Sequence, residues 1–160
     1  MPVNLGRLAE LPGHRIIEAS LAGTVLFAAT TLPAAAGVEA FQVPAAVVSL
    51  VLFGVSIPLS LHALARAALR TARQEDSITV SGLFFLQGSA PRPVRLLLLG
   101  SLAVSVAICV VAAAKEPFGI LQPVFPLALA AEWGARHGTF PRIPSPEPDP
   151  RRRSGPHPAD

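Results

Sequence analysis

Residues 96–114 read LLLLGSLAVSVAICVVAAA, an apolar run without a charged side chain. A helix of about 20 such residues crosses the hydrocarbon core of a bilayer, which is about 30 Å thick. Three further stretches, at 16–38, 43–64 and 118–135, are also mainly apolar. The sequence therefore predicts an all-α membrane protein whose four transmembrane helices form an up-down bundle.

Basic residues are divided unequally between the two sides that four crossings create. The chain has 13 basic residues, and all but Lys115 precede the first span, follow the fourth or lie in the loop 65–95. Cytoplasmic regions carry such an excess of Lys and Arg, so both termini are predicted to be cytoplasmic. The plan is then a cytoplasmic N-terminus at 1–15, a transmembrane domain at 16–138 and a tail at 139–160.

The composition leaves little room for a soluble domain. Of the 160 residues, 51% are hydrophobic and 14% are charged. Arginine far outnumbers lysine, and alanine and proline are abundant, which points to the plasma membrane of a bacterium. The chain has a net charge of +3, and its arginines lie beside the membrane spans. Anionic lipids are therefore the expected partner. Nucleic acid is not expected, because no basic face carries interleaved aromatic residues.

The first span has two interpretations. Basic residues precede it and it ends in Ala34-Ala35-Ala36, which is typical of a cleavable signal peptide. Against cleavage, Glu18 lies inside the supposed apolar core, and residues 19–38 are long enough to span. A retained helix is favoured, and cleavage would leave the orientation of the other spans unchanged.

The fourth span is interrupted by Pro123 and Pro126. These prolines remove backbone donors and crowd the preceding turn, which predicts a kink near Gln122. A re-entrant loop is the alternative, but it would place the later arginines outside the cell, against the charge rule. Gln122 itself is expected to bond a neighbouring helix or a carbonyl that the kink frees.

Between the second and third spans the sequence changes character. The second helix is expected to continue past the membrane to about Gln74, because Ala, Leu and Arg favour helix. Residues 78–86 are apolar but too short to cross, so they are predicted to lie at the interface or beneath the bundle. In the tail 139–160, prolines alternate with polar residues, which predicts disorder.

A set of seven residues is predicted to contact lipid head groups. Arginines near the ends of spans can lay their stems along apolar surface and reach phosphates, and tryptophan is enriched at the membrane interface. Arg66, Arg70 and Arg73 share one helix face, which fits either general anchoring or a dedicated lipid or partner stripe. The whole set is Arg66, Arg70, Arg73, Arg92, Arg95, Trp133 and Arg136.

The chain has no HExxH, GxSxG, Walker or CxxC motif, so it is predicted not to be an enzyme. The single cysteine, Cys109, excludes an internal disulfide, and neither a metal site nor a cofactor is expected. Three ionisable residues, Glu18, His62 and Glu132, lie at similar depth near the cytoplasmic ends of their helices. They form a candidate polar site for proton relay, although Glu132 can also simply pair with Arg136 one turn on.

Small residues recur at helical intervals in three spans. Such stripes let membrane helices approach closely and hydrogen-bond. Packing within one chain is the favoured interpretation, and a homodimer face is the alternative. The stripes are Ala19 and Gly23 in the first span, Ser49, Ser56 and Ser60 in the second, and Ser101, Ser105, Cys109 and Ala113 in the third.

The fourth span ends in Trp133-Gly134-Ala135-Arg136-His137-Gly138-Thr139-Phe140-Pro141. This W-G-A-R-H-G-x-F-P signature resembles the end of a family of small, uncharacterised actinobacterial integral membrane proteins with four predicted helices and a similar tail. The hydropathy layout extends the likeness over residues 15–141. The resemblance implies topology and origin, and it implies no activity and no catalytic residue.

These features together predict a non-enzymatic accessory or structural subunit, bound to a membrane-protein partner or to copies of itself. The alternative is a small proton-linked transporter that works as an oligomer. Inverted repeats would favour transport, but the two halves of the chain show no clear internal similarity.

Overall fold

The computed structural model describes residues 11–73, 77–115 and 117–141. Over this part of the chain the fold is helical and contains no strand, so the all-α prediction is confirmed there. In chain order the elements are α1 (His14–Ala35), η2 (Glu39–Phe41), α2 (Gln42–Ala72), α3 (Val80–Phe84), α4 (Arg92–Ala112), η3 (Pro117–Leu121) and α5 (Val124–His137).

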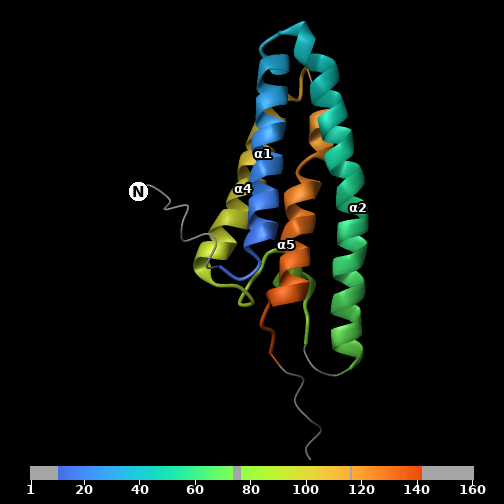
Figure 1. Cartoon of the computed structure of the whole chain (residues 1–160), viewed down its shortest axis with the longest axis vertical. Helices are drawn as coiled ribbons and strands as arrows, with labels where there is room; N and C mark the ends of the chain where they lie inside the picture. Colours follow the sequence, from blue (N-terminus) through green and yellow to red (C-terminus); the bar gives the residue numbers. More distant parts are fainter. Residues whose placement is uncertain (1–10, 74–76, 116, 142–160) are drawn as a thin grey trace, which may run out of the picture.

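The helices α1, α2, α4 and α5 form one elongated bundle (Figure 1). η2 joins α1 to α2, which run antiparallel. α1 and α4 run parallel, because Ser20 bonds Ser101 and Thr24 bonds Ser105 one turn further along both helices. α5 lies along α2 in the same direction as α2. The starts of α1 and α4 and the ends of α2 and α5 therefore meet at one end of the bundle.

Three helices are long and apolar enough to cross a membrane, namely α1, α2 together with η2, and α4. They correspond to the first three predicted spans. α5 has 14 residues, and at 1.5 Å per residue it is about 21 Å long, which is shorter than the hydrocarbon core of about 30 Å. The predicted fourth span at 118–135 is therefore not one continuous helix but η3 followed by α5.

The break between η3 and α5 falls at Gln122 and Pro123, where the prolines predict a kink. Pro123 has no N–H to continue a helix from η3, and the N–H of Gln122 donates to the carbonyl of Gly119 at 3.1 Å. Lys115 precedes η3 and lies near Gly37, at the far end of α1. The indole N–H of Trp133 on α5 donates to the carbonyl of Pro12, just before α1, so the segment runs from one end of the bundle to the other.

α2 continues to Ala72, as the run of Ala, Leu and Arg after residue 64 predicts. The apolar stretch 78–86 contains α3, whose first turn is capped by Thr79: its Oγ1 accepts from the N–H of Gly82 at 3.1 Å. Leu83 is buried and packs with residues of α2 and α5. This segment therefore packs against the last turns of α5 and the facing part of α2.

The predicted stripes of small residues pack inside the chain in part, because Ala19 and Ala113 are exposed and Ser60 is half-buried. Ser101, Ser105 and Cys109 are buried on α4, and two of them bond hydroxyls of α1. Gly23 lies so close to the ring of Phe125 that an added Cβ would clash with it. The favoured interpretation, packing within one chain, accounts for these contacts.

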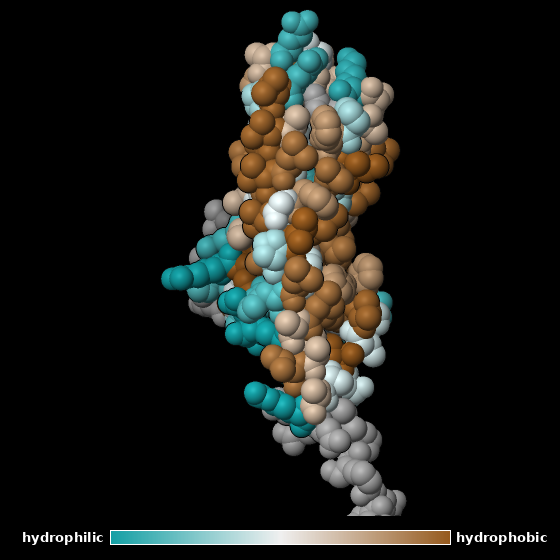
Figure 2. All heavy atoms as spheres, turned by 90° about the vertical axis from the view of Figure 1, so that its right-hand side faces the viewer, coloured by the Kyte–Doolittle hydropathy of each residue, from teal (hydrophilic) through white to brown (hydrophobic). Residues whose placement is uncertain are grey.

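The outward faces of α2 and α4 are apolar. Figure 2 shows hydrophobic residues over most of the face on which α2 lies, with hydrophilic residues at the upper end and in the lower half. Exposed apolar surface of this extent marks a membrane or partner surface. It includes Val43, Val47, Leu50, Val51, Val55, Leu61, Leu96, Val104, Val110 and Val111.

Most of the predicted N-terminal region 1–15 and of the tail 139–160 lies outside the described residues, so these two assignments stay predictions. The exception is the beginning of the tail. The N–H of Thr139 donates to the carbonyl of Ser89 at 3.0 Å, and the carbonyl of Pro141 accepts from the N–H of Ser77 at 2.8 Å. These bonds tie residues 139–141 to the segment between α2 and α4.

Candidate functional site

Glu132 is the one buried acidic side chain in the part of the chain that the structure describes, and it is 2% exposed. It lies on α5, which is surrounded by α1, α2, α3 and α4. Nearly every residue from Phe125 to Ala135 is consequently buried. The burial of a carboxylate follows from the central position of its helix, and such a charge is costly unless it is paired.

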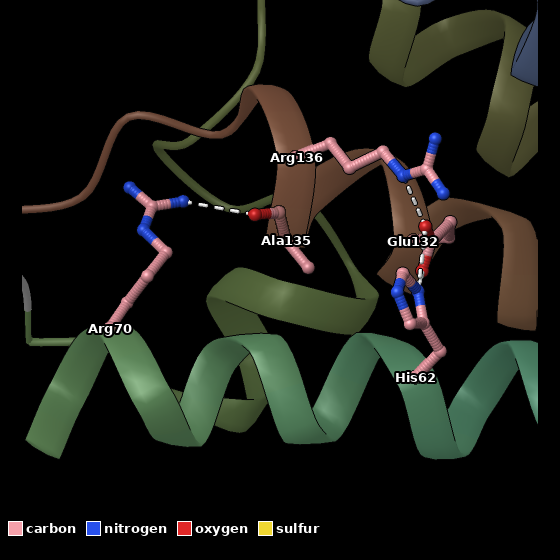
Figure 3. A network of polar contacts seen from close by, with 5 residues as sticks. All are labelled: His62, Arg70, Glu132, Ala135 and Arg136. Carbon is pink, nitrogen blue, oxygen red and sulfur yellow. Dashed lines mark hydrogen bonds and ion pairs between the residues drawn. The ribbon is translucent and has the colours of Figure 1, made fainter.

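Two basic side chains hold Glu132 (Figure 3). Nδ1 of His62, on α2, lies 3.0 Å from Oε1 and 2.9 Å from Oε2. Nε of Arg136, one turn further along α5, donates to Oε1. An ionised carboxylate only accepts hydrogen bonds, so with that charge state the tautomer that fits has its proton on Nδ1 of His62. The side chains of His62 and Arg136 are 46% and 45% exposed, so this cluster connects a buried charge to the surface.

Glu18 does not join this cluster. It is exposed on α1, while its neighbours Ile17 and Ser20 turn into the core. The predicted convergence of three ionisable residues is thus wrong for Glu18, and the structure brings together only His62 and Glu132. The sequence indicated depth along each helix, but it did not indicate which way each side chain points.

Arg70 has a role that the sequence did not reveal. Its Nη1 donates to the carbonyl of Ala135 at 3.1 Å and its Nη2 to the carbonyl of Gly138 at 3.4 Å, and its guanidinium lies 5.4 Å from the ring centroid of Phe140. The last carbonyls of a helix lack partners within it and attract cations. The prediction of Arg70 as a lipid contact is therefore corrected: it caps α5 from α2.

Trp133 is also not a lipid contact. Its side chain is buried, and its indole N–H donates to the carbonyl of Pro12 at 2.7 Å, which fixes the start of α1 to α5. The reason is again that α5 is covered on all sides. The other five residues of the predicted head-group set are exposed, namely Arg66, Arg73, Arg92, Arg95 and Arg136. Of these, Arg136 is bound to Glu132.

Two buried polar side chains have no hydrogen-bond partner within the described residues. They are Gln122, through both Oε1 and Nε2, and Thr31, through Oγ1. The prediction that Gln122 bonds a neighbouring helix or a freed carbonyl is therefore wrong. Buried polar groups nearly always have a partner, so this unpaired amide at the helix break is the second unusual polar feature of the bundle.

The cluster of His62, Glu132 and Arg136 can act in two ways. Charge-assisted hydrogen bonds fasten α2 to α5. The imidazole and the carboxylate can also share a proton close to the surface. Among the described residues, no three His, Cys, Asp or Glu side chains are grouped so that they could hold a metal ion.

The chain matches no protein-family model, no curated protein and no solved structure. The resemblance of residues 133–141 to actinobacterial membrane proteins therefore stays a prediction. The contacts within the bundle are the basis on which a function can be inferred.

Proposed function

We propose that the protein is a non-enzymatic accessory or structural subunit of an assembly in the plasma membrane. The observation that carries this proposal is the use of its buried polar side chains. Ser20 bonds Ser101 at 2.6 Å between α1 and α4, and Glu132 binds His62 between α5 and α2. In lipid, such bonds hold helices together. Polar groups engaged in joining helices support a structural role.

The orientation in the membrane is part of this proposal, with four crossings, both termini in the cytoplasm and η3 plus α5 as the fourth crossing. The positive-inside rule places the basic end of the bundle at the cytoplasmic face. Lys115 lies at the opposite end, near Gly37. The described arginines that support this orientation all lie near the end where α1 begins, and they are Arg15, Arg66, Arg70, Arg73, Arg92, Arg95 and Arg136.

A broken fourth crossing is compatible with a bilayer because of where it lies. Irregular backbone at membrane depth is tolerated where protein covers it. Gln122 at the break is fully buried, and Gly119 of η3 accepts a hydrogen bond from Sγ of Cys109 on α4 at 3.0 Å. Gly119 and Gln122 are thus covered by the other helices, whereas the side chains of Phe118, Ile120 and Val124 face outward.

The outer face of α2 is the surface that we assign to a partner. Gly54 is exposed in the middle of this apolar face, and a Cβ added to it would meet no atom within 4 Å. A small residue on an open membrane face allows another helix to approach closely. A subunit of a larger assembly needs such a face.

Affinity purification of the tagged full chain in a mild detergent tests the role. A stoichiometric membrane-protein partner is expected to accompany the wild type. Gly54→Leu should reduce recovery of the partner, whereas Gly100→Leu, at an equally open position on α4, should not. A clean homo-oligomer without a partner would contradict the accessory role.

The second candidate is a small proton-linked transporter that acts as an oligomer. Two observations favour it: the contact of the half-exposed His62 with the buried Glu132, and the unpaired Gln122 beside a broken helix. Broken helices form binding sites in many transporters. Proton flux into liposomes that hold the protein, abolished by Glu132→Gln, would support transport, and flux no greater than in empty liposomes would contradict it.

A further inference from the structure

One stripe of α4 combines positive charge with an open apolar surface. Its residues recur at i, i+3, i+4, i+7 and i+8, which places them on a single helix face. Both arginines are exposed, and Leu96 is 73% exposed. The stripe lines an open hollow of about 500 Å³ and consists of Arg92, Arg95, Leu96, Leu99 and Gly100.

The two arginines are available to a ligand. Arg70 caps α5 and Arg136 binds Glu132. By contrast, within the described residues neither Arg92 nor Arg95 has a side-chain hydrogen bond or ion pair. Both lie in the first turn of α4, where the positive end of the helix dipole adds to their attraction for an anion.

The apolar half of the stripe lies further along α4, toward the middle of the bundle. A Cβ added to Gly100 would meet nothing within 4 Å, so the stripe is hollowed there between the leucine side chains. From Arg92 to Gly100 the helix rises about 12 Å. An anionic phospholipid presents the matching order of chemistry, with a phosphate at the interface and an acyl chain below it.

We propose that this stripe binds one anionic phospholipid. The phosphate lies between Arg92 and Arg95, and an acyl chain lies along Leu96, Leu99 and Gly100. The assignment rests on the proposed orientation, which puts the start of α4 at the cytoplasmic leaflet, where anionic lipids attract basic residues. It differs from general anchoring because it requires a defined lipid chemistry and an open position at Gly100.

Native mass spectrometry of the detergent-solubilised full chain tests the site with phosphatidylglycerol and, for comparison, phosphatidylcholine. One phosphatidylglycerol per chain is expected to be retained in preference to phosphatidylcholine. The double variant Arg92→Gln/Arg95→Gln should weaken this binding by about 30-fold, since each arginine at the membrane surface contributes about 1 kcal/mol. The matched double variant Arg66→Gln/Arg73→Gln removes two exposed arginines of α2 and should leave binding unchanged.

The acyl-chain half of the site has its own control. Gly100→Leu should weaken phosphatidylglycerol binding by filling the hollow, whereas Gly54→Leu on α2 should not. Inorganic phosphate, which lacks an acyl chain, should not displace the lipid. Any one of four outcomes would overturn the site. They are equal retention of the two lipids, equal loss of phosphatidylglycerol binding in the two double variants, unchanged binding in Gly100→Leu, and displacement of the lipid by phosphate. None of these outcomes bears on the partner recovery that tests the accessory role.

Discussion

The carboxylate of Glu132 and its two basic partners have unequal surroundings. The carboxylate is buried because other helices cover α5, while His62 and Arg136 keep nearly half of their side-chain surface exposed. Removing the carboxylate therefore frees two cations that can turn to the surface. Removing a partner would instead leave the buried charge less well paired, which is the more costly change in general.

Glu132→Gln is expected to lower the free energy of unfolding by about 1–3 kcal/mol, because it removes the charged acceptor of two hydrogen bonds. Thermal unfolding of the purified protein in detergent measures this change. The matched control is Glu18→Gln, an exposed carboxylate at the same end of the bundle, which should leave the unfolding temperature unchanged. Equal effects of the two substitutions would refute the role of Glu132 as a link between α2 and α5.

Gln122→Leu is expected to raise the free energy of unfolding by about 1–3 kcal/mol, because an amide buried without partners costs its full desolvation. The same thermal measurement applies, with Gln42→Leu at an exposed position of α2 as the control. A destabilised Gln122→Leu protein would show that the amide has a partner, such as an internal water.

At the scale of elements, two glycines on helices have opposite surroundings. A Cβ at Gly134 of α5 would lie 2.8 Å from the backbone carbonyl oxygen of Leu83 in α3, whereas one at Gly54 of α2 would meet nothing within 4 Å. The backbone of α3 cannot yield as a flexible side chain would. The close approach of α3 to α5 therefore depends on Gly134.

Gly134→Ala should accordingly reduce the free energy of unfolding by about 1–3 kcal/mol through overpacking. Gly54→Ala should be neutral or stabilise by up to about 1 kcal/mol, because alanine favours helix over glycine. Unfolding of both variants in the same detergent compares the two. If both substitutions had the same sign and size, α3 would not be packed on α5 as described.

At the scale of the whole molecule, the orientation can be tested by labelling intact cells. In a Cys109→Ala background, single cysteines replace Glu39, Ser81 or Ser154, and a membrane-impermeant maleimide is added. Only the cysteine at position 39 should react, because the proposed orientation puts the basic end of the bundle at the cytoplasmic face. Labelling at 154 but not at 39 would reverse the orientation. Lysed cells serve as the positive control, because the cysteines at 39 and 154 should both react once the membrane is disrupted.

The sequence by itself determined the helical class, the three long apolar helices and the place of the break at Gln122 and Pro123. These features depend on local properties, because hydropathy over about 20 residues sets a span and proline removes a donor wherever it stands. The extension of α2 to Ala72 has the same local origin, in residues that favour helix.

Only the tertiary structure decided which polar residues are buried and what they bind. Glu18 and Glu132 have similar depth in the sequence pattern, yet one is exposed and the other is enclosed, because α1 lies at the edge of the bundle and α5 at its centre. Trp133 was misassigned to lipid for the same reason, and Arg70 because the end of α5 lies within reach of its side chain. The burial of a side chain depends on the helices that surround its own, and that arrangement is fixed by contacts between residues far apart in the chain.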